Sequence, residues 1–254
     1  MADINASENT CKNCNYTFTK QYCNGCGQKN AARITLAHLS HDVMHAVLHA
    51  DKGIFPYIKR LILNPGVMAR EYIAGKRKVF NPMQFLVLSV GFVMLMMTFT
   101  NYYGKMEIWE AESMAANPQA IQEKLKGFNT FIKKNSNLIV FFLIPFFALF
   151  GSMLFSKKKN NYAEHLMLSV FALSLSNILT LIMLISCYFI GFGIMTSLIL
   201  TSIITVTSFF LTYKQFYQIN WFSALWKSII TYMLTMMVSM IVSTVVGFCI
   251  LLFT

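Results

Sequence analysis

The sequence contains few charged residues. Asp, Glu, Lys and Arg make up 12 % of its 254 residues, whereas hydrophobic residues make up 56 %. An average soluble domain has about one quarter charged residues, because polar side chains must cover a surface that faces water. The composition therefore excludes an ordinary water-soluble domain and indicates a protein embedded in lipid.

Acidic residues are especially scarce, with 10 Asp and Glu against 21 Lys and Arg and a net charge of +11. The basic residues occur mainly in short clusters between apolar runs. This placement is typical of charges that orient a membrane protein, more than of a basic face for nucleic acid. Nucleic acid is therefore not expected as a partner.

Signals for secretion and catalysis are also missing. The first 33 residues are polar and contain no apolar core of the kind a cleavable signal peptide needs. We expect the first apolar run to act as an internal insertion signal. The chain has no Gly-x-Ser-x-Gly, phosphate loop, His-Glu-x-x-His or intramembrane aspartate pair, so no catalytic residue is assigned and enzymatic activity is not expected.

Uncharged runs dominate the rest of the chain. They cover residues 79–104, 135–156, 165–213 and 228–254. One membrane crossing takes roughly 20 residues, so the third run suits two helices, with the Gly-Phe-Gly sequence at 191–193 as the turn between them. The runs predict about five transmembrane helices, at 83–102, 137–155, 166–189, 194–213 and 229–252, with an outer loop at 103–136.

The distribution of Lys and Arg predicts the orientation of these helices. If the N-terminus is cytosolic, the inside segments 1–82, 156–165 and 214–228 hold 16 of the basic residues and the outside segments hold 5. Basic residues accumulate on the cytosolic side of membrane proteins. The N-terminus is therefore predicted inside and the C-terminus outside.

Four cysteines carry the strongest chemical signal. They form two Cys-x-x-Cys pairs, Cys11 with Cys14 and Cys23 with Cys26, separated by eight residues. Each pair can wrap a tight turn around a metal, and two such turns complete the tetrahedral four-sulfur shell that Zn²⁺ prefers. We predict a structural zinc site whose metal drives folding of the module. Disulfides, which need an oxidising compartment, and an iron–sulfur or redox role are the alternatives.

Residues 34–50 form a predicted amphipathic helix. Its apolar residues gather on one side, and four histidines gather on the other: His38, His41, His45 and His49. Spacings of three and four let imidazoles share a ligand, so a second metal site or a pH-sensing face is one interpretation. The other is a polar face on a helix that lies against the bilayer or the spans.

A basic motif lies directly before the first span. It contains Arg70, Lys76, Arg77 and Lys78, and Lys59 and Arg60 precede it. Each basic residue near an anionic leaflet contributes roughly 1 kcal/mol to membrane binding. The motif therefore predicts contact with anionic lipid headgroups, and recognition of a phosphate or an acidic partner is the alternative.

Hydroxyl residues recur at helical spacing in the last two predicted spans. They are Ser197, Thr201, Thr205, Ser208 and Thr212 in the fourth and Thr231, Thr235, Ser239 and Ser243 in the fifth. Such stripes let helices approach and hydrogen-bond. They predict either a packing seam between the two spans or a path for a polar substrate.

Several of these motifs together resemble a known family. The second cysteine pair, the Asn-Pro-Gly at 64–66, the Arg-Glu-Tyr at 70–72, the Gly-Lys-Arg at 75–77 and the Asn-Pro at 81–82 resemble a domain-of-unknown-function family of bacterial inner-membrane proteins. The resemblance covers roughly residues 11–82. It implies an N-terminal zinc ribbon and a bacterial inner-membrane location, and it supplies no activity.

The sequence thus predicts an all-α integral membrane protein preceded by a small zinc ribbon and amphipathic helices. The expected divisions are a zinc-ribbon module at 1–30, cytosolic and juxtamembrane helices at 31–82 and a membrane domain at 83–254. Its expected role is a membrane-anchored interaction or scaffold protein that binds the bilayer and a cytosolic protein. A transporter or channel subunit that uses the hydroxyl-lined helices is the alternative.

Overall fold

The computed structural model describes residues 9–30, 34–35, 53–77, 79–114, 136–156, 160–191 and 193–253. The four histidines of the predicted amphipathic helix and Lys78 of the basic motif lie outside these described residues, as does most of the expected outer loop.

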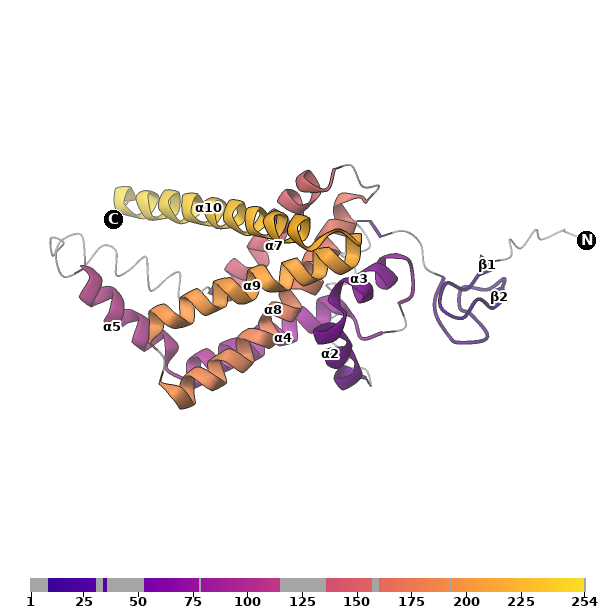
Figure 1. Cartoon of the computed structure of the whole chain (residues 1–254), viewed down its shortest axis with the longest axis horizontal. Helices are drawn as coiled ribbons and strands as arrows, with labels where there is room; N and C mark the ends of the chain where they lie inside the picture. Colours follow the sequence, from indigo (N-terminus) through magenta and orange to yellow (C-terminus); the bar gives the residue numbers. More distant parts are fainter. Residues whose placement is uncertain are drawn as a thin grey trace, which may run out of the picture.

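The described part of the chain is mostly helical. A short hairpin of β1 (Asn9–Thr10) and β2 (Thr17–Phe18) pairs Asn9 with Phe18 in antiparallel register. The helices are α2 (Ile54–Leu63), α3 (Pro65–Ile73), α4 (Pro82–Phe99), α5 (Tyr102–Met114), α7 (Ser136–Leu154), α8 (Tyr162–Ile190), α9 (Ile194–Tyr217) and α10 (Trp221–Phe253). The long helices follow the long axis of the molecule, the hairpin lies beyond one end, and the C-terminus lies toward the other (Figure 1).

The helix bundle has two ends. The head end is where α4, α8 and α10 begin and α7 and α9 end, next to α2, α3 and the hairpin. The far end carries α5 and the turn between α8 and α9. Helix α8 is central: it packs against α4, α7 and α9, and 67 % of its most apolar stretch is buried, compared with 17 % for α9.

Four of the described helices are long and apolar enough to cross a membrane. They are α4, α8, α9 and the Trp221–Val245 part of α10. The expectation of a helical membrane protein is confirmed at this level. The expected span at 137–155 corresponds to α7, whose described apolar part, Phe141–Leu154, is shorter.

Three helices extend beyond the expected spans, because the charged residues that flank the uncharged runs are themselves part of helices. Glu164, Lys214 and Lys227 lie within α8, α9 and α10. Glu164 even helps to start its helix: the Asn161 side chain accepts from its backbone N–H at 2.8 Å, and its carboxylate accepts from the Asn161 N–H at 3.1 Å. This capping box satisfies amides that an exposed helix end would leave open.

Local sequence features define two other helix ends. Asn81 caps α4 by accepting from the backbone N–H of Met83 at 3.0 Å, and Pro82 occupies the first helical position. Gly191 ends α8 in the left-handed conformation, with φ +79°, before the chain reverses into α9.

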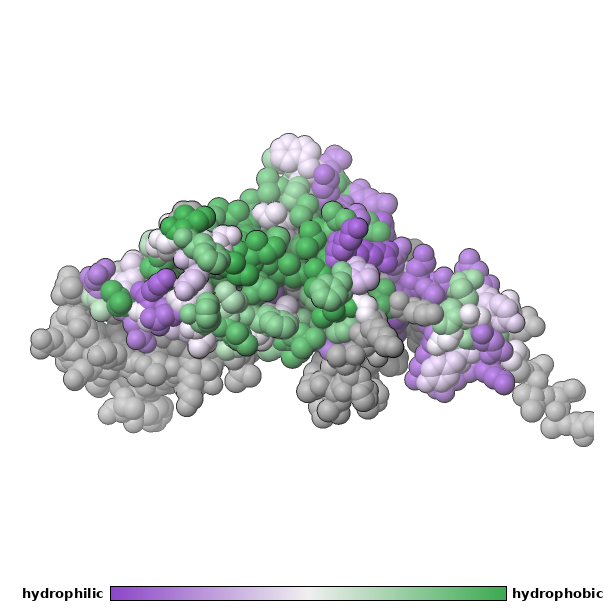
Figure 2. Space-filling model, turned by 90° about the horizontal axis from the view of Figure 1, so that it is seen from below, coloured by the Kyte–Doolittle hydropathy of each residue, from purple (hydrophilic) through white to green (hydrophobic). Residues whose placement is uncertain are grey.

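Apolar side chains cover the outside of the long helices. Exposed examples are Phe92, Leu95, Ile199, Ile203, Met233, Met237 and Met240. Figure 2 shows this apolar body, with hydrophilic side chains concentrated toward the cysteine module. A continuous apolar surface of this kind indicates contact with lipid.

The hydroxyl stripes are hydrogen-bonded within and between helices. Thr212 donates to the Ser208 carbonyl at 2.7 Å, and Thr235 donates to the Thr231 carbonyl at 2.8 Å. Thr212, Thr231 and Thr235 are fully buried, and the hydroxyl of Thr205 is hydrogen-bonded to that of Ser176 in α8 at 3.1 Å. This pattern favours the packing interpretation over a polar path.

The elbow between α2 and α3 is seated directly on the backbone of α9. A Cβ atom on Gly66 would overlap the carbonyl oxygen of Thr212 and would lie 2.5 Å from the backbone nitrogen of Phe216. Gln215 holds both sides of the elbow: its side-chain oxygen accepts from the Gly66 N–H at 3.0 Å, and its amide donates to the Leu63 carbonyl at 3.2 Å. One side chain of α9 thus caps the end of α2 and the start of α3.

Replacing Gly66 by Ala should destabilise the protein, because the added methyl group has no space against α9. We expect a loss of about 1–3 kcal/mol in unfolding free energy, the range for overpacking. Gly91→Ala in α4 is the matched control, since nothing lies within 4 Å of its added Cβ. Thermal unfolding in detergent measures both variants. An unchanged transition temperature for Gly66→Ala would contradict the close seating.

Candidate metal centre

The four cysteines of the N-terminal module lie together. Their sulfur atoms all fall within 4.8 Å of one another, with 3.6 Å between Cys11 and Cys26 and 3.5 Å between Cys14 and Cys23. None of the four is in a disulfide. A tetrahedral ion with metal–sulfur bonds of about 2.3 Å places its ligand sulfurs about 3.8 Å apart. The cluster therefore fits a metal ion held by four thiolates.

Two matching turns position these sulfurs. In the first, the Asn15 N–H donates to the Cys11 carbonyl at 2.9 Å; in the second, the Gly27 N–H donates to the Cys23 carbonyl at 2.8 Å. Asn15 and Gly27 both adopt left-handed conformations, with φ of +61° and +73°. Glycine and asparagine are the residues that tolerate this conformation best. The same backbone path thus brings the two Cys-x-x-Cys segments to one point.

Hydrogen bonds from the turns tune the thiols. The backbone N–H of Gln28, followed by the Asn13 side chain, lowers the pKa of Cys26 to about 6. Backbone N–H groups of Cys14 and Asn13 also lower the pKa of Cys11. Thiolates are the metal-binding form of cysteine, so these hydrogen bonds favour the metal-binding form of Cys11 and Cys26.

The cysteine module is attached to the helices through Gln28. Its side-chain amide donates to the Gly75 carbonyl at 2.7 Å, and its side-chain oxygen accepts from the Arg77 N–H at 3.1 Å. Gln28 is buried, and its own carbonyl accepts from the Cys23 N–H at 2.9 Å inside the metal-binding turn. One residue therefore contacts both the candidate metal centre and the turn that follows α3.

A second attachment lies a few residues further along the chain. Ile34 is buried in the main hydrophobic core, and its carbonyl accepts from the Asn161 side chain at 3.1 Å. Asn161 also caps α8. The segment after the module is therefore joined to the most buried helix of the bundle.

The basic motif is divided among several contacts. Arg60 forms an ion pair with Glu71, and Lys76 lies 3.8 Å from the same carboxylate. The Arg77 guanidinium lies over the Tyr72 ring, 5.6 Å from its centre. Tyr72 in turn packs edge-on against Phe171 of α8. The motif thus helps to hold α3 in place, and Arg70 is partly exposed beside it.

Sequence reasoning missed Gln28, Glu71 and Gln215. Gln28 lies two residues after Cys26, which is a local signal for a role near the metal. Its hydrogen-bond partners lie 47 and 49 residues away, however, and no short motif indicates them.

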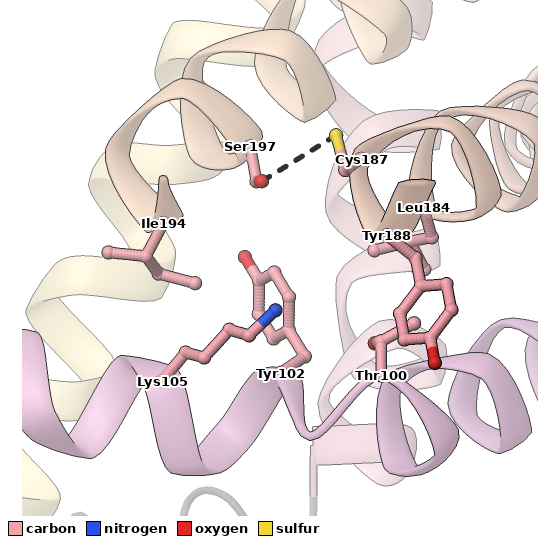
Figure 3. Close-up of a pocket in the computed structure, with 8 residues that line it drawn as sticks. All are labelled: Thr100, Tyr102, Lys105, Leu184, Cys187, Tyr188, Ile194 and Ser197. Carbon is pink, nitrogen blue, oxygen red and sulfur yellow. Dashed lines mark hydrogen bonds between the residues drawn. The ribbon is translucent and has the colours of Figure 1, made fainter. Parts of the chain in front are cut away.

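A small hollow at the far end offers a contrast to the metal centre. It is lined by Thr100, Tyr102, Lys105, Leu184, Cys187, Tyr188, Ile194 and Ser197, and Lys105 and Tyr102 extend into it from α5 (Figure 3). The Ser197 hydroxyl faces the Cys187 sulfur at 3.8 Å. The cavity has a volume of about 20 Å³, which is room for about one water molecule. We assign no ligand to it.

Residues 51–94 match the model of a family described as a protein of unknown function, DUF3667. The match covers α2, α3, the Gly75–Arg77 turn and the head-end part of α4, and it stops short of the cysteine module. No curated protein and no solved structure matches the chain. The matched segment is thus the part of the chain that forms the elbow on α9 and receives Gln28.

Metal content provides a direct test of the cysteine cluster. Purified wild-type protein should contain one metal ion per chain, and Cys23→Ser with Cys26→Ser should abolish it, because half of the ligands are lost. Cys187 lies outside the cluster, so Cys187→Ala should leave the metal content unchanged. Protons compete with the metal for the thiolates, so wild-type protein should lose its metal progressively as the pH is lowered. Elemental mass spectrometry measures each case, and full occupancy in the double variant would refute the site.

Replacing Gln28 by Ala should detach the module without emptying the metal site. The Arg77 amide loses its acceptor, so its hydrogen exchange should accelerate by at least about tenfold, the factor that corresponds to a hydrogen bond of roughly 1.4 kcal/mol. The matched control is Gln21→Ala, an exposed glutamine of the same module. Unchanged exchange at Arg77 in the Gln28 variant would show that another contact holds the module.

Proposed function

We propose that the protein is a membrane-anchored docking platform of the bacterial inner membrane. In this proposal the helices cross the bilayer with the head end in the cytosol, and a zinc ion clamps the cysteine module. A cytosolic protein with an acidic surface docks on the module. Neither catalysis nor transport is part of the proposed role.

The observation that supports this role most is the fixed position of an exposed, basic module. Gln28 and Ile34 hold the module against the head end through hydrogen bonds of 2.7 to 3.1 Å. A freely tethered metal module would not need a buried glutamine that bonds both to its own turn and to the helices. A rigid attachment presents the module in one orientation, which suits recognition by a partner.

The surface of the module has the composition of an interaction site. Tyr16 and Tyr22 are about half exposed, at 51 % and 53 %. Lys12, Lys20 and Lys29 are exposed beside them, and residues 9–30 contain no Asp or Glu. Tyrosine is enriched in protein interfaces, and a basic surface selects partners of opposite charge.

Zinc is the metal that the ligand set supports best. Four thiolates complete a tetrahedral shell and leave no position for water or substrate. The reducing cytosol keeps thiols available for a metal. A bound zinc would hold the two turns together, since a module this small has little core of its own.

Site-specific photocrosslinking in native membranes tests the platform. With p-benzoylphenylalanine replacing Tyr22, we expect protein adducts whose yield falls several-fold when Lys20→Glu and Lys29→Glu remove the basic surface. Lys105→Glu at the far end is the charge-reversal control and should leave the yield unchanged. Adducts that persist after reversal of the module charge, or adducts with lipid alone, would contradict docking of an acidic protein.

A further inference from the structure

Helix α2 has an exposed apolar side that none of the other described helices covers. Tyr57 and Leu61 are buried, whereas Phe55 is 81 % exposed and Ile62 is 38 % exposed. At 3.6 residues per turn, Phe55 and Ile62 lie about 20° apart around the helix. Leu63, which is 59 % exposed, lies about 80° from Phe55 on the other side, so the three exposed apolar side chains form a stripe about 100° wide on the side of α2 away from the core.

The position of α2 matches the boundary between the apolar body and water. Tyr57 packs on Phe85 in the first turn of α4, with 4.8 Å between ring centres. The last residue of α2, Leu63, bonds to Gln215 at the end of α9. Figure 1 shows α2 crossing the direction of the long helices at the head end. Helix α2 thus lies at the same depth as the ends of the spans, and its axis crosses their direction.

Exposed aromatic residues also mark the head end of helix α10. Helix α10 begins there with Trp221, Phe222 and Trp226, which are 61 %, 67 % and 39 % exposed. Tryptophan concentrates where membrane proteins cross the headgroup region. The stripe of α2 and the start of α10 therefore lie at one interfacial level.

The charge around α2 is positive. Described cations at the head end are Lys59, Arg60, Arg70, Lys76, Arg77, Lys214 and Lys227. The described acids there are Glu71, which is engaged by Arg60 and Lys76, and Glu164, which is used in the α8 capping box. Lys59 is exposed and lies between Phe55 and Leu63 around the helix, about 60° from Ile62. A lysine in this place can bury its methylenes along lipid and extend its ammonium to a phosphate.

We propose that α2 is an in-plane membrane helix that binds anionic phospholipid. Phe55 and Ile62 insert among the acyl chains, and Lys59 binds the headgroup phosphate. Continuity with the apolar surface of the spans and the surrounding positive charge favour lipid as the occupant of this face. The assignment to the cytosolic leaflet rests on the proposed function, because the orientation of the chain in the membrane is part of that proposal.

Photocrosslinking in reconstituted bilayers tests this assignment. The full-length protein carries p-benzoylphenylalanine at one of three exposed positions: Phe55 as the test, Phe92 on α4 as the span reference and Tyr22 on the cysteine module as the reference away from lipid. Intact mass spectrometry identifies each adduct. We expect lipid adducts at Phe55 and Phe92 and none at Tyr22.

Headgroup preference tests the role of Lys59. In mixed phosphatidylcholine and phosphatidylglycerol bilayers, adducts at Phe55 should be enriched in phosphatidylglycerol by up to about fivefold at low ionic strength, the factor expected from one basic residue at an anionic surface. Lys59→Gln should remove this enrichment, and Lys105→Gln at the far end should not. Enrichment that survives Lys59→Gln would overturn the headgroup contact.

The remaining outcomes separate the two proposals. Lipid adducts at Phe92 without any at Phe55, or adducts that join Phe55 to a second protein chain, would overturn the in-plane helix and leave the platform intact. Absence of lipid adducts at both positions would overturn the placement of the bundle in the bilayer. Protein adducts at Tyr22 that depend on the module lysines support the platform whatever the result at Phe55.

Discussion

The positions of α2, α3 and the cysteine module depend on one close contact, in which Gly66 packs directly against the backbone of α9. Because no side chain separates the two backbones, Gln215 can bond to both sides of the elbow. The elbow sends α2 across the end of the bundle and directs α3 along α8 and α9. The turn after α3 then receives Gln28, so the location of the cysteine module follows from the contact at Gly66.

Amide groups and charged groups have different tasks at the head end. Gln28, Asn161 and Gln215 make the long-range links, each through directional hydrogen bonds of 2.7 to 3.2 Å. A neutral amide with its partners in place costs far less to bury than a charge does. The cations make other contacts: Arg60 and Lys76 lie at Glu71, and Lys227 donates to the Leu154 carbonyl at 3.0 Å. Amides thus set the position of the module, while the cations stabilise the helices around it.

This division also explains what a metal would contribute. The two cysteine turns share one backbone geometry, and Gln28 extends the second turn directly to the Gly75–Arg77 turn. Holding the turns together therefore also holds Gln28 in its bonding position. A structural ion would order the turn that carries Gln28, and the buried Gln28 amide attaches that turn to the bundle. The order of the module and its attachment to the bundle are therefore coupled.

The sequence by itself determined the features that depend on neighbouring residues. Uncharged runs specify apolar helices, because burial of each residue in lipid requires no distant partner. Asn81 and Gly191 mark helix ends, and the cysteine spacing brings the four sulfur atoms together. Tertiary structure decided which partners Gln28 and Gln215 bond to and that Thr205 of the hydroxyl stripe pairs with Ser176 of α8. It also decided that Glu164, Lys214 and Lys227 belong to helices, although these three residues flank the uncharged runs from which the spans are predicted. The physical reason is range: local geometry follows from spacing along the chain, whereas contacts between residues 47 to 152 positions apart exist only once the helices have packed.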